Sequence, residues 1–158
     1  MNPLQTAILR HTTTDGRQHF DWLLAQTEIV LADARETLCW RCPRPLTEMN
    51  VDEEMVVQAI QKHRGMYLTL DGARELSGER GRVEPVARGW AQELQEWQAR
   101  DHAATARTAA PCAMTAPNER ARCRYFILRF EGAPPLCVTL AGDRLTRVAH
   151  FTNMNAKD

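Results

Sequence analysis

Short apolar runs bounded by Gly, Pro, Asn or Asp recur along the chain and predict β-strands. The first two runs, residues 6–11 and 19–25, enclose Asp15-Gly16, a dipeptide typical of a hairpin turn. Residues 26–36 fit either a short helix or a third strand with a loop. Further strands are predicted over residues 37–42, 66–70, 82–86, 125–130, 136–140 and 145–151.

Two segments carry helical signals. Residues 47–61 place apolar side chains at three-to-four spacing, with Thr47 as a candidate cap and acidic residues in the first predicted turn. Residues 89–107 are rich in Ala, Gln, Glu and Arg and favour a second helix. Trp90 and Trp97 would share one face of it and dock the segment onto the rest of the fold, with base stacking as the alternative role.

The number of strands and the short connections between them predict antiparallel pairing. We expect a mainly β (α+β) fold, a small antiparallel β-barrel with one or two peripheral helices. Residues 108–123 are poor in apolar side chains and contain prolines, which predicts a loop. The chain is therefore expected to be a single domain, residues 1–158, with an inserted helical and loop segment at about 89–123.

Composition narrows the classes of function. The chain has 158 residues, and an apolar content of 44% is sufficient for a folded core. We expect a cytoplasmic protein with no membrane partner, because no run of about 18 uncharged apolar residues and no secretory signal pattern occurs. Twenty basic and twenty acidic residues cancel, which excludes a broad cationic surface but leaves room for local phosphate binding by a few arginines.

The cysteines favour packing over chemistry. There are five, an odd number, which together with the missing secretory signal predicts reduced thiols. Cys39 and Cys42 have the C-x-x-C spacing of zinc and redox sites. Neither a second such pair nor a strand-to-helix context accompanies them, so both are interpreted as strand cysteines.

Candidate chemistry gathers at the predicted hairpin. His19 and Asp21 are two apart on a strand, so their side chains share one face. An odd loop centred on Gly16 would place Asp21 opposite His11 and bring the three together, whereas a two-residue turn would place Phe20 there instead. Two imidazoles and one carboxylate with open positions suit a divalent transition metal that binds a phosphate oxygen. The alternative is an ordinary polar strand face.

The remaining histidines are less informative by themselves. His63 follows the predicted helix, and Tyr67 lies four residues later at the start of a predicted strand. Viewed alone, they fit a helix-end histidine and a tyrosine that packs into the sheet. His102 and His150 are interpreted as structural or surface residues.

Several weak motifs occur in a fixed order and together resemble the 3′-phosphoesterase domain of bacterial end-joining DNA ligases of the ligase D type, and its small stand-alone relatives. The order and approximate spacing hold over residues 7–83 and 125–151, whereas 89–123 lie outside the pattern. The matching pieces are His11, His19-Phe20-Asp21, Leu38-Cys39-Trp40-Arg41-Cys42-Pro43-Arg44, Lys62-His63-Arg64-Gly65-Met66-Tyr67, Leu70-Asp71-Gly72, Ser77-Gly78-Glu79-Arg80-Gly81 and the closing hairpin at 138–145.

The resemblance implies an activity and a cofactor. It implies a compact β-barrel that removes a 3′-phosphate or a terminal 3′-ribonucleoside from nucleic-acid ends during DNA end repair. It implies a divalent ion held by His11, His19 and Asp21, expected to be Mn²⁺, with Zn²⁺ and Co²⁺ as alternatives. His63 would contact the scissile phosphate, and stabilise its charge or protonate the leaving oxygen, while Tyr67 would donate a hydrogen bond to the same phosphate.

The chain also departs from the family pattern. Leu23 stands where the ligase-fused domains have an arginine that faces the phosphate, and Leu9 and Gln61 stand at two further positions expected to be polar. Loss of a bidentate phosphate clamp weakens transition-state binding. Basic residues that could substitute for it are Arg10, Arg44, Arg64 and Arg80.

Two classes of function follow. The joint presence of five polar site residues favours a metal-dependent phosphoesterase. Leu23 and the zero net charge favour a noncatalytic nucleic-acid or metal-binding module of the same fold that has lost turnover. A structural domain without a site is a third reading, which dispersed histidines would support. The expected partners are nucleic-acid 3′ ends and a separate ligase or polymerase, and a monomer is favoured.

Overall fold

The computed structural model describes residues 2–95 and 123–151, which form β-strands and two short 3-10 helices. Neither helix in this part of the chain is long or apolar enough to cross a membrane. The helices are η1 (Leu46–Glu48) and η2 (Gly65–Thr69). The strands are β1 (Leu4–Thr12), β2 (Gln18–Leu24), β3 (Arg35–Cys42), β4 (Glu54–Val56), β5 (Gln58–Arg64), β6 (Arg74–Glu75), β7 (Arg82–Leu94), β8 (Arg124–Phe130), β9 (Leu136–Ala141) and β10 (Arg144–Val148).

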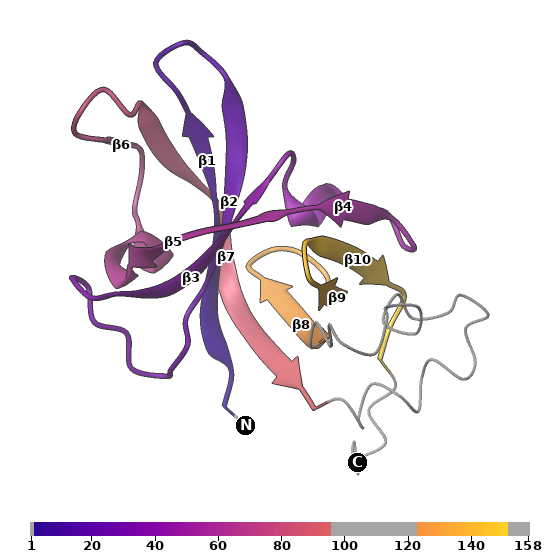
Figure 1. Cartoon of the computed structure of the whole chain (residues 1–158). Helices are drawn as coiled ribbons and strands as arrows, with labels where there is room; N and C mark the ends of the chain where they lie inside the picture. Colours follow the sequence, from indigo (N-terminus) through magenta and orange to yellow (C-terminus); the bar gives the residue numbers. More distant parts are fainter. Residues whose placement is uncertain (1, 96–122, 152–158) are drawn as a thin grey trace.

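All the strands belong to one antiparallel sheet with the order β4-β10-β9-β8-β7-β1-β2-β3-β5, and β6 pairs with β7 outside this path. In Figure 1, β8, β9 and β10 lie on one side of the long strand β7, and β1, β2 and β3 lie on the other. The end strands β4 and β5 are separated in the chain only by Val57, yet no ladder joins them in the described residues. The mainly β, antiparallel prediction is confirmed, whereas closure into a barrel is not.

Strands β1, β2 and β3 separate two apolar clusters because their side chains alternate between the two faces of the sheet. On one face, Trp22 and Trp40 stack with 4.7 Å between ring centroids inside the main core. On the other face, Leu9, Leu23 and Cys39 belong to a smaller cluster that also includes a buried leucine of η2. The candidate site continues this second face.

The β1–β2 hairpin has the odd loop on which convergence of the site residues depends. Thr12 pairs with Gln18, so the loop contains the five residues 13–17. The loop is centred one residue earlier than predicted, and His11 therefore lies opposite His19 instead of Asp21, which pairs with Leu9. An even shift in pairing keeps every side chain on its face, so the three polar groups still share one side of the sheet.

The predicted helix over residues 47–61 is wrong. These residues complete η1 and then form β4 and β5, which pair with β10 and β3. Buried Met55 and Val57 are two apart, whereas a bulge in β5 brings Ile60 and His63, three apart, onto one face. This mixture of spacings resembles a helical period, and strand pairing overrides the local propensity.

Three other local predictions change. Residues 66–70 lie mostly in η2 and form no strand, and Gly65 at the start of η2 packs against the backbone of Leu31 in the loop before β3. That loop occupies residues 26–34, and residues 35 and 36 begin β3, so the helix alternative is wrong and the segment is a loop that leads into the third strand. Strand β7 runs through Leu94, so residues 89–94 are extended, and Trp90 lies exposed on that strand. Trp97 and the rest of the predicted insertion up to residue 122 lie outside the described residues.

Cysteine packing agrees only in part with the expectation. Cys39 and Cys42 are buried in different apolar clusters, as expected for two strand cysteines of opposite parity. Cys137 is also a free thiol. Cys123 is disulfide-bonded, which corrects the prediction that all five thiols are reduced.

Gly81 is required where the β6–β7 connection crosses β1. Its φ is 91°, and an added Cβ would collide with the carbonyl oxygen of Thr12. We expect Gly81→Ala to cost about 3 kcal/mol of unfolding free energy in urea, the sum of left-handed strain and overpacking.

Gly78 in the same connection is the matched control. Its φ is 68°, but nothing lies within 4 Å of an added Cβ. Gly78→Ala should therefore cost only about 1 kcal/mol. Equal losses of stability in the two variants would contradict the assigned collision.

Candidate functional site

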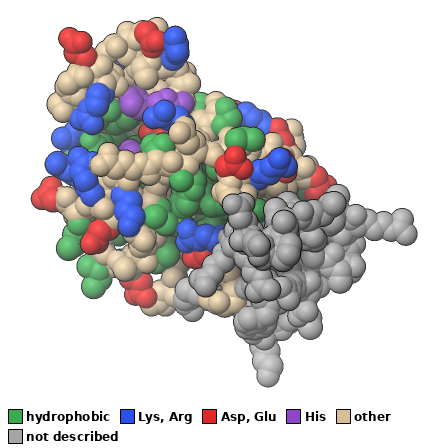
Figure 2. All heavy atoms as spheres, viewed as in Figure 1, with side chains coloured by type: hydrophobic (Ala, Val, Ile, Leu, Met, Phe, Trp, Pro, Cys, Tyr) green, Lys and Arg blue, Asp and Glu red, His purple; other side chains and the backbone are tan. Residues whose placement is uncertain are grey.

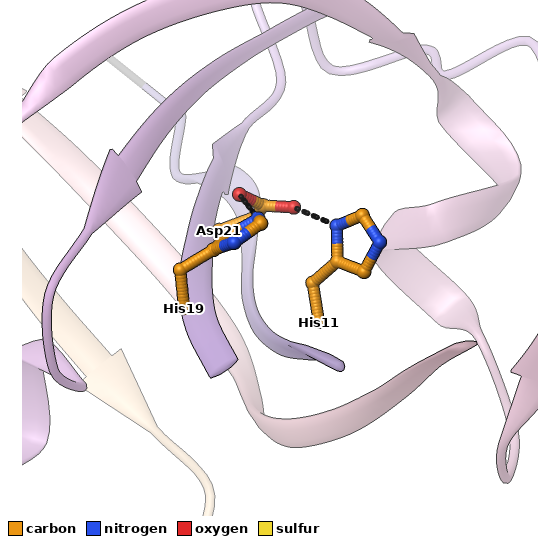
Figure 3. A group of neighbouring side chains, drawn as sticks. All are labelled: His11, His19 and Asp21. Atoms are coloured by element: carbon orange, nitrogen blue, oxygen red, sulfur yellow. Dashed lines mark ion pairs between the residues drawn. The ribbon is translucent and has the colours of Figure 1, made fainter. Parts of the chain in front are cut away.

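His11, His19 and Asp21 converge on one face of β1 and β2 near the hairpin turn, as Figure 3 shows. His11 Nδ1 lies 3.9 Å from Asp21 Oδ2, and His19 Nε2 lies 3.4 Å from Asp21 Oδ1. The two imidazole rings meet edge to face with 4.6 Å between centroids. One ligand atom from each residue lies within 4.8 Å of the others, so this group could hold a metal ion.

The unpaired atoms of this group fit a cation. Asp21 is only 2% exposed, and its Oδ1 has no hydrogen-bond donor; the His19 Nε2 atom is also buried without a partner. An isolated buried carboxylate is unfavourable, and a bound cation would offset that cost. Burial lowers the pKa of His19, an effect that Asp21 opposes and that Arg41 and His11 strengthen. The lowered pKa favours the neutral imidazole, the form that binds metals.

A backbone contact sets the orientation of His11. Its Nε2 lies 2.7 Å from the carbonyl oxygen of Arg80. A carbonyl can only accept, so Nε2 carries the proton and Nδ1 keeps its lone pair toward Asp21. Histidines that bind metals are typically oriented by such a second hydrogen bond. The donor set of two imidazoles and one carboxylate suits Mn²⁺, Zn²⁺ or Co²⁺.

A bulge directs His63 toward the same site. Cys39 pairs with Ile60 and Thr37 pairs with His63, so β5 uses three residues where β3 uses two. Without the extra residue, Lys62 would occupy the position of His63. The Nδ1 of His63 donates to the Gln61 carbonyl at 2.9 Å, which leaves Nε2 for other contacts.

His63 borders a cavity of about 550 Å³, which His19 does not line. Tyr67 of η2 lines it, with its ring edge to face with His63 at 5.9 Å between centroids. His11 and Asp21 form another part of the wall. The sequence therefore identified residues from three separate segments that the fold brings to one cavity.

The cavity wall is cationic although the chain has no net charge. Figure 2 shows histidine side chains on one face of the molecule with Lys and Arg side chains beside them. Six basic residues line the cavity: Arg35, Arg41, Lys62, Arg64, Arg74 and Arg80. In the described ranges, none of the six makes an ion pair with a carboxylate.

The arginines outside the cavity provide a contrast. Seven of them have carboxylate partners within the described residues: Arg10, Arg17, Arg44, Arg82, Arg88, Arg124 and Arg144. The positive charge left without a carboxylate partner is therefore concentrated at the cavity, where it favours an anionic ligand.

The candidate phosphate-binding arginines divide into two groups. Arg64 and Arg80 line the cavity, although the guanidinium of Arg80 also donates to Ser77. Arg44 pairs with Glu53, and Arg10 pairs with Glu84 at 3.3 Å; neither lines the cavity.

Sequence reasoning missed Arg41, which lines the cavity. Arg41 lies on β3 directly opposite Asp21 in the backbone register of β2 and β3. Sequence reasoning also missed Arg35, Lys62 and Arg74. The alternation of side chains along a strand could have identified two of these. Arg35 and Arg41 are an even number of residues from Cys39, so they lie on the same face of β3, which is the site face.

Two departures from the family pattern have a structural setting. Leu23 is fully buried in the small apolar cluster, directly opposite Cys39. Leu9 belongs to the same cluster and also lines the cavity. These leucines form an apolar base beneath the polar residues.

Burial raises the pKa of the Cys39 thiol far above its ordinary value, and burial raises the pKa of Cys42 to about 12, so both thiols are protonated at neutral pH.

Neither the models of known protein families nor the sequences of curated proteins match the chain. The site is therefore described by its own features: a group of possible metal ligands beside a cationic cavity, on one antiparallel sheet.

Proposed function

We propose that this protein is a metal-dependent phosphoesterase that acts on nucleic-acid 3′ ends and removes a 3′-phosphate or a terminal 3′-ribonucleoside. The main support is that one cavity is lined by His11 and Asp21 of the metal-ligand group, by His63, and by basic residues without carboxylate partners in the described residues. A cation beside a cationic wall suits a ligand with concentrated negative charge, and a phosphate group is such a ligand.

His11, His19 and Asp21 would hold the ion. When bound, a divalent ion supplies Lewis acidity to a phosphate oxygen. The Arg80 carbonyl keeps His11 in the tautomer that offers Nδ1, and the depth of Asp21 limits competition by water. Manganese is the proposed ion, with Zn²⁺ and Co²⁺ as alternatives that the same donors accept.

Arg41 is proposed to bind the phosphate in place of the arginine that Leu23 replaces. It lies across from Asp21 on the neighbouring strand and lines the cavity without a carboxylate partner in the described residues. Its planar guanidinium can donate two parallel hydrogen bonds to phosphate oxygens. Arg64 and Arg80 are proposed as further phosphate contacts because they line the same cavity.

His63 and Tyr67 are proposed as the catalytic side chains. The Nδ1–H of His63 is held by the Gln61 carbonyl, so Nε2 can carry a second proton to the leaving oxygen. Tyr67 lies beside this ring and can donate its hydroxyl hydrogen to a phosphate oxygen.

Arg41→Ala should lower kcat/KM on a 3′-phosphorylated primer-template by about 10- to 100-fold, the value of a charge-assisted hydrogen bond. Arg10→Ala is the matched control, because Arg10 is also a strand arginine but pairs with Glu84 away from the cavity. A similar loss in both variants would point to general electrostatics and would exclude Arg41 as a specific contact.

The function is tested with a labelled primer-template that ends in a 3′-phosphate or a single 3′-ribonucleotide, with added Mn²⁺. We expect metal-dependent trimming of the end, which His19→Ala abolishes together with Mn²⁺ binding in calorimetry. His150→Ala, which removes an imidazole outside the cavity, should retain both. Metal binding without trimming would instead support the noncatalytic module, with Leu23 as the reason. Unchanged Mn²⁺ affinity in His19→Ala would exclude His19 as a ligand.

A further inference from the structure

A second group of possible ligands lies directly against the first. Asp21, Cys39 and His63 each offer one ligand atom, and these atoms lie within 4.8 Å of one another. Asp21 is common to both groups, and within the first group its Oδ2 lies near His11 and its Oδ1 near His19. We infer that Asp21, Cys39 and His63 form a second ion position that is selective for thiophilic divalent cations such as Zn²⁺ and Co²⁺.

The orientation of His63 is the first support for this position. Its Nδ1 donates to the backbone carbonyl of Gln61 at 2.9 Å, so the lone pair lies on Nε2. The same arrangement orients His11 through the Arg80 carbonyl. Each ligand group therefore contains a histidine held by a backbone carbonyl in the tautomer that metal ligation needs.

The second support is Asp21, which is 2% exposed and whose Oδ1 has no hydrogen-bond donor. The charge of a buried carboxylate with an unpaired oxygen is compensated well by cations on both sides, and a carboxylate has the lone pairs to bind two ions. An oxygen of Asp21 lies within 4.8 Å of a ligand atom of every other member of the two groups.

Cys39 determines which ions the second position accepts. Thiolate sulfur prefers Zn²⁺ and Co²⁺, whereas Mn²⁺ is a harder ion that prefers oxygen ligands and binds thiolate weakly. The two positions therefore differ in selectivity, with Mn²⁺ at the group of His11 and His19. Binding forms a metal–sulfur bond, and the Cys39 thiol proton passes to the solvent; no electron is transferred.

Occupancy of the second position has a functional consequence, and this part alone rests on the proposed function. An ion bound by the Nε2 lone pair of His63 prevents that nitrogen from carrying a proton to the leaving oxygen. Zn²⁺ bound at this position is therefore expected to inhibit the turnover that Mn²⁺ supports, in addition to the exchange of Mn²⁺ for Zn²⁺ that the group of His11, His19 and Asp21 permits.

Cobalt titration of the full chain tests the position directly, because thiolate bound to Co²⁺ gives a charge-transfer absorption in the near ultraviolet. We expect this absorption to accompany one equivalent of bound Co²⁺, with a second equivalent bound that does not contribute to it. His19→Ala should remove the second equivalent and keep the absorption. A single equivalent that carries the absorption in the parent protein would overturn a separate second position.

Two buried cysteines of one strand provide a matched pair of variants. Cys39→Ala should abolish the absorption. Cys42→Ala should retain it, because Cys42 lies on the opposite face of β3, in the main apolar core. Partly exposed His63 gives a variant with less risk to folding, and His63→Ala should also abolish the absorption. Persistence of the band in Cys39→Ala or His63→Ala, or its absence from the parent protein, would overturn the inference.

The inhibitory effect is measured separately as the ratio of Mn²⁺-supported turnover with and without Zn²⁺. The ratio should be at least tenfold lower in the parent protein than in Cys39→Ala, in which Zn²⁺ can act only at the group of His11, His19 and Asp21. Equal ratios in both proteins would overturn the inhibition. Because the cobalt spectrum needs no turnover, failure of the proposed function and failure of the second position give different results.

Discussion

His63→Ala is expected to lower turnover of a 3′-phosphorylated primer-template by about 10²- to 10⁴-fold, the usual contribution of a general acid. Mn²⁺ affinity should not change, because His63 is not part of the group formed by His11, His19 and Asp21. Steady-state kinetics and calorimetry on the same preparation give both values. A loss confined to kcat at unchanged metal occupancy is the signature of a group that acts on the reacting phosphate.

Gln58→Ala is the matched control for this prediction. Gln58 is an exposed residue at the other end of β5 and does not line the cavity. Its loss should leave both turnover and ion binding unchanged. If His63→Ala retained the turnover of the parent protein, the catalytic role would be excluded; if it lost Mn²⁺, His63 would have to be counted among the ligands of the first group.

Asp21→Asn is expected to separate stability from ion binding. Without an ion, the carboxylate of Asp21 is buried and its Oδ1 is unpaired, so the native side chain destabilises the fold. The amide can donate a hydrogen bond to the unpaired Nε2 of His19. We therefore expect the metal-free variant to be about 1–3 kcal/mol more stable than the metal-free parent in urea unfolding.

The same substitution should remove the stabilisation that the parent protein gains from Mn²⁺. That gain is about 2.7 kcal/mol when the free ion is present at 100 times its Kd, and the variant should show none of it. Asp15→Asn, an exposed hairpin-loop change, serves as the control and should retain the full gain. A metal-free Asp21→Asn protein that is less stable than the parent and still stabilised by Mn²⁺ would contradict the assigned role.

Local patterns in the sequence determined a large part of this site. Strand periodicity placed His19 and Asp21 on one face, and an odd hairpin loop brought His11 to that face even though its centre lies at Asp15 and not at Gly16. These relations involve residues close in the chain, where the side-chain period of two leaves few possibilities. For the same reason, the mainly β, antiparallel character followed from short apolar runs and turn residues.

Contacts between distant segments decided the rest. The helix expected over residues 47–61 became β4 and β5, because pairing with β10 and β3 outweighs a local apolar spacing. A bulge in β5 brings His63 to the site, and a bulge leaves no clear mark in the local pattern. The pairing of β2 with β3 places Arg41 across from Asp21, while Arg44 pairs with Glu53 outside the cavity.

The sequence by itself thus determined the strand-rich class, the shared face of His19 and Asp21, and the types of side chain available for chemistry. The tertiary structure alone decided which basic residues surround the cavity, that Cys39 lies within reach of Asp21 and His63, and that the ends of the sheet remain unpaired in the described residues. The physical reason is register. Within one hairpin a short loop limits it, whereas between distant strands it depends on bulges and on the packing of both apolar clusters.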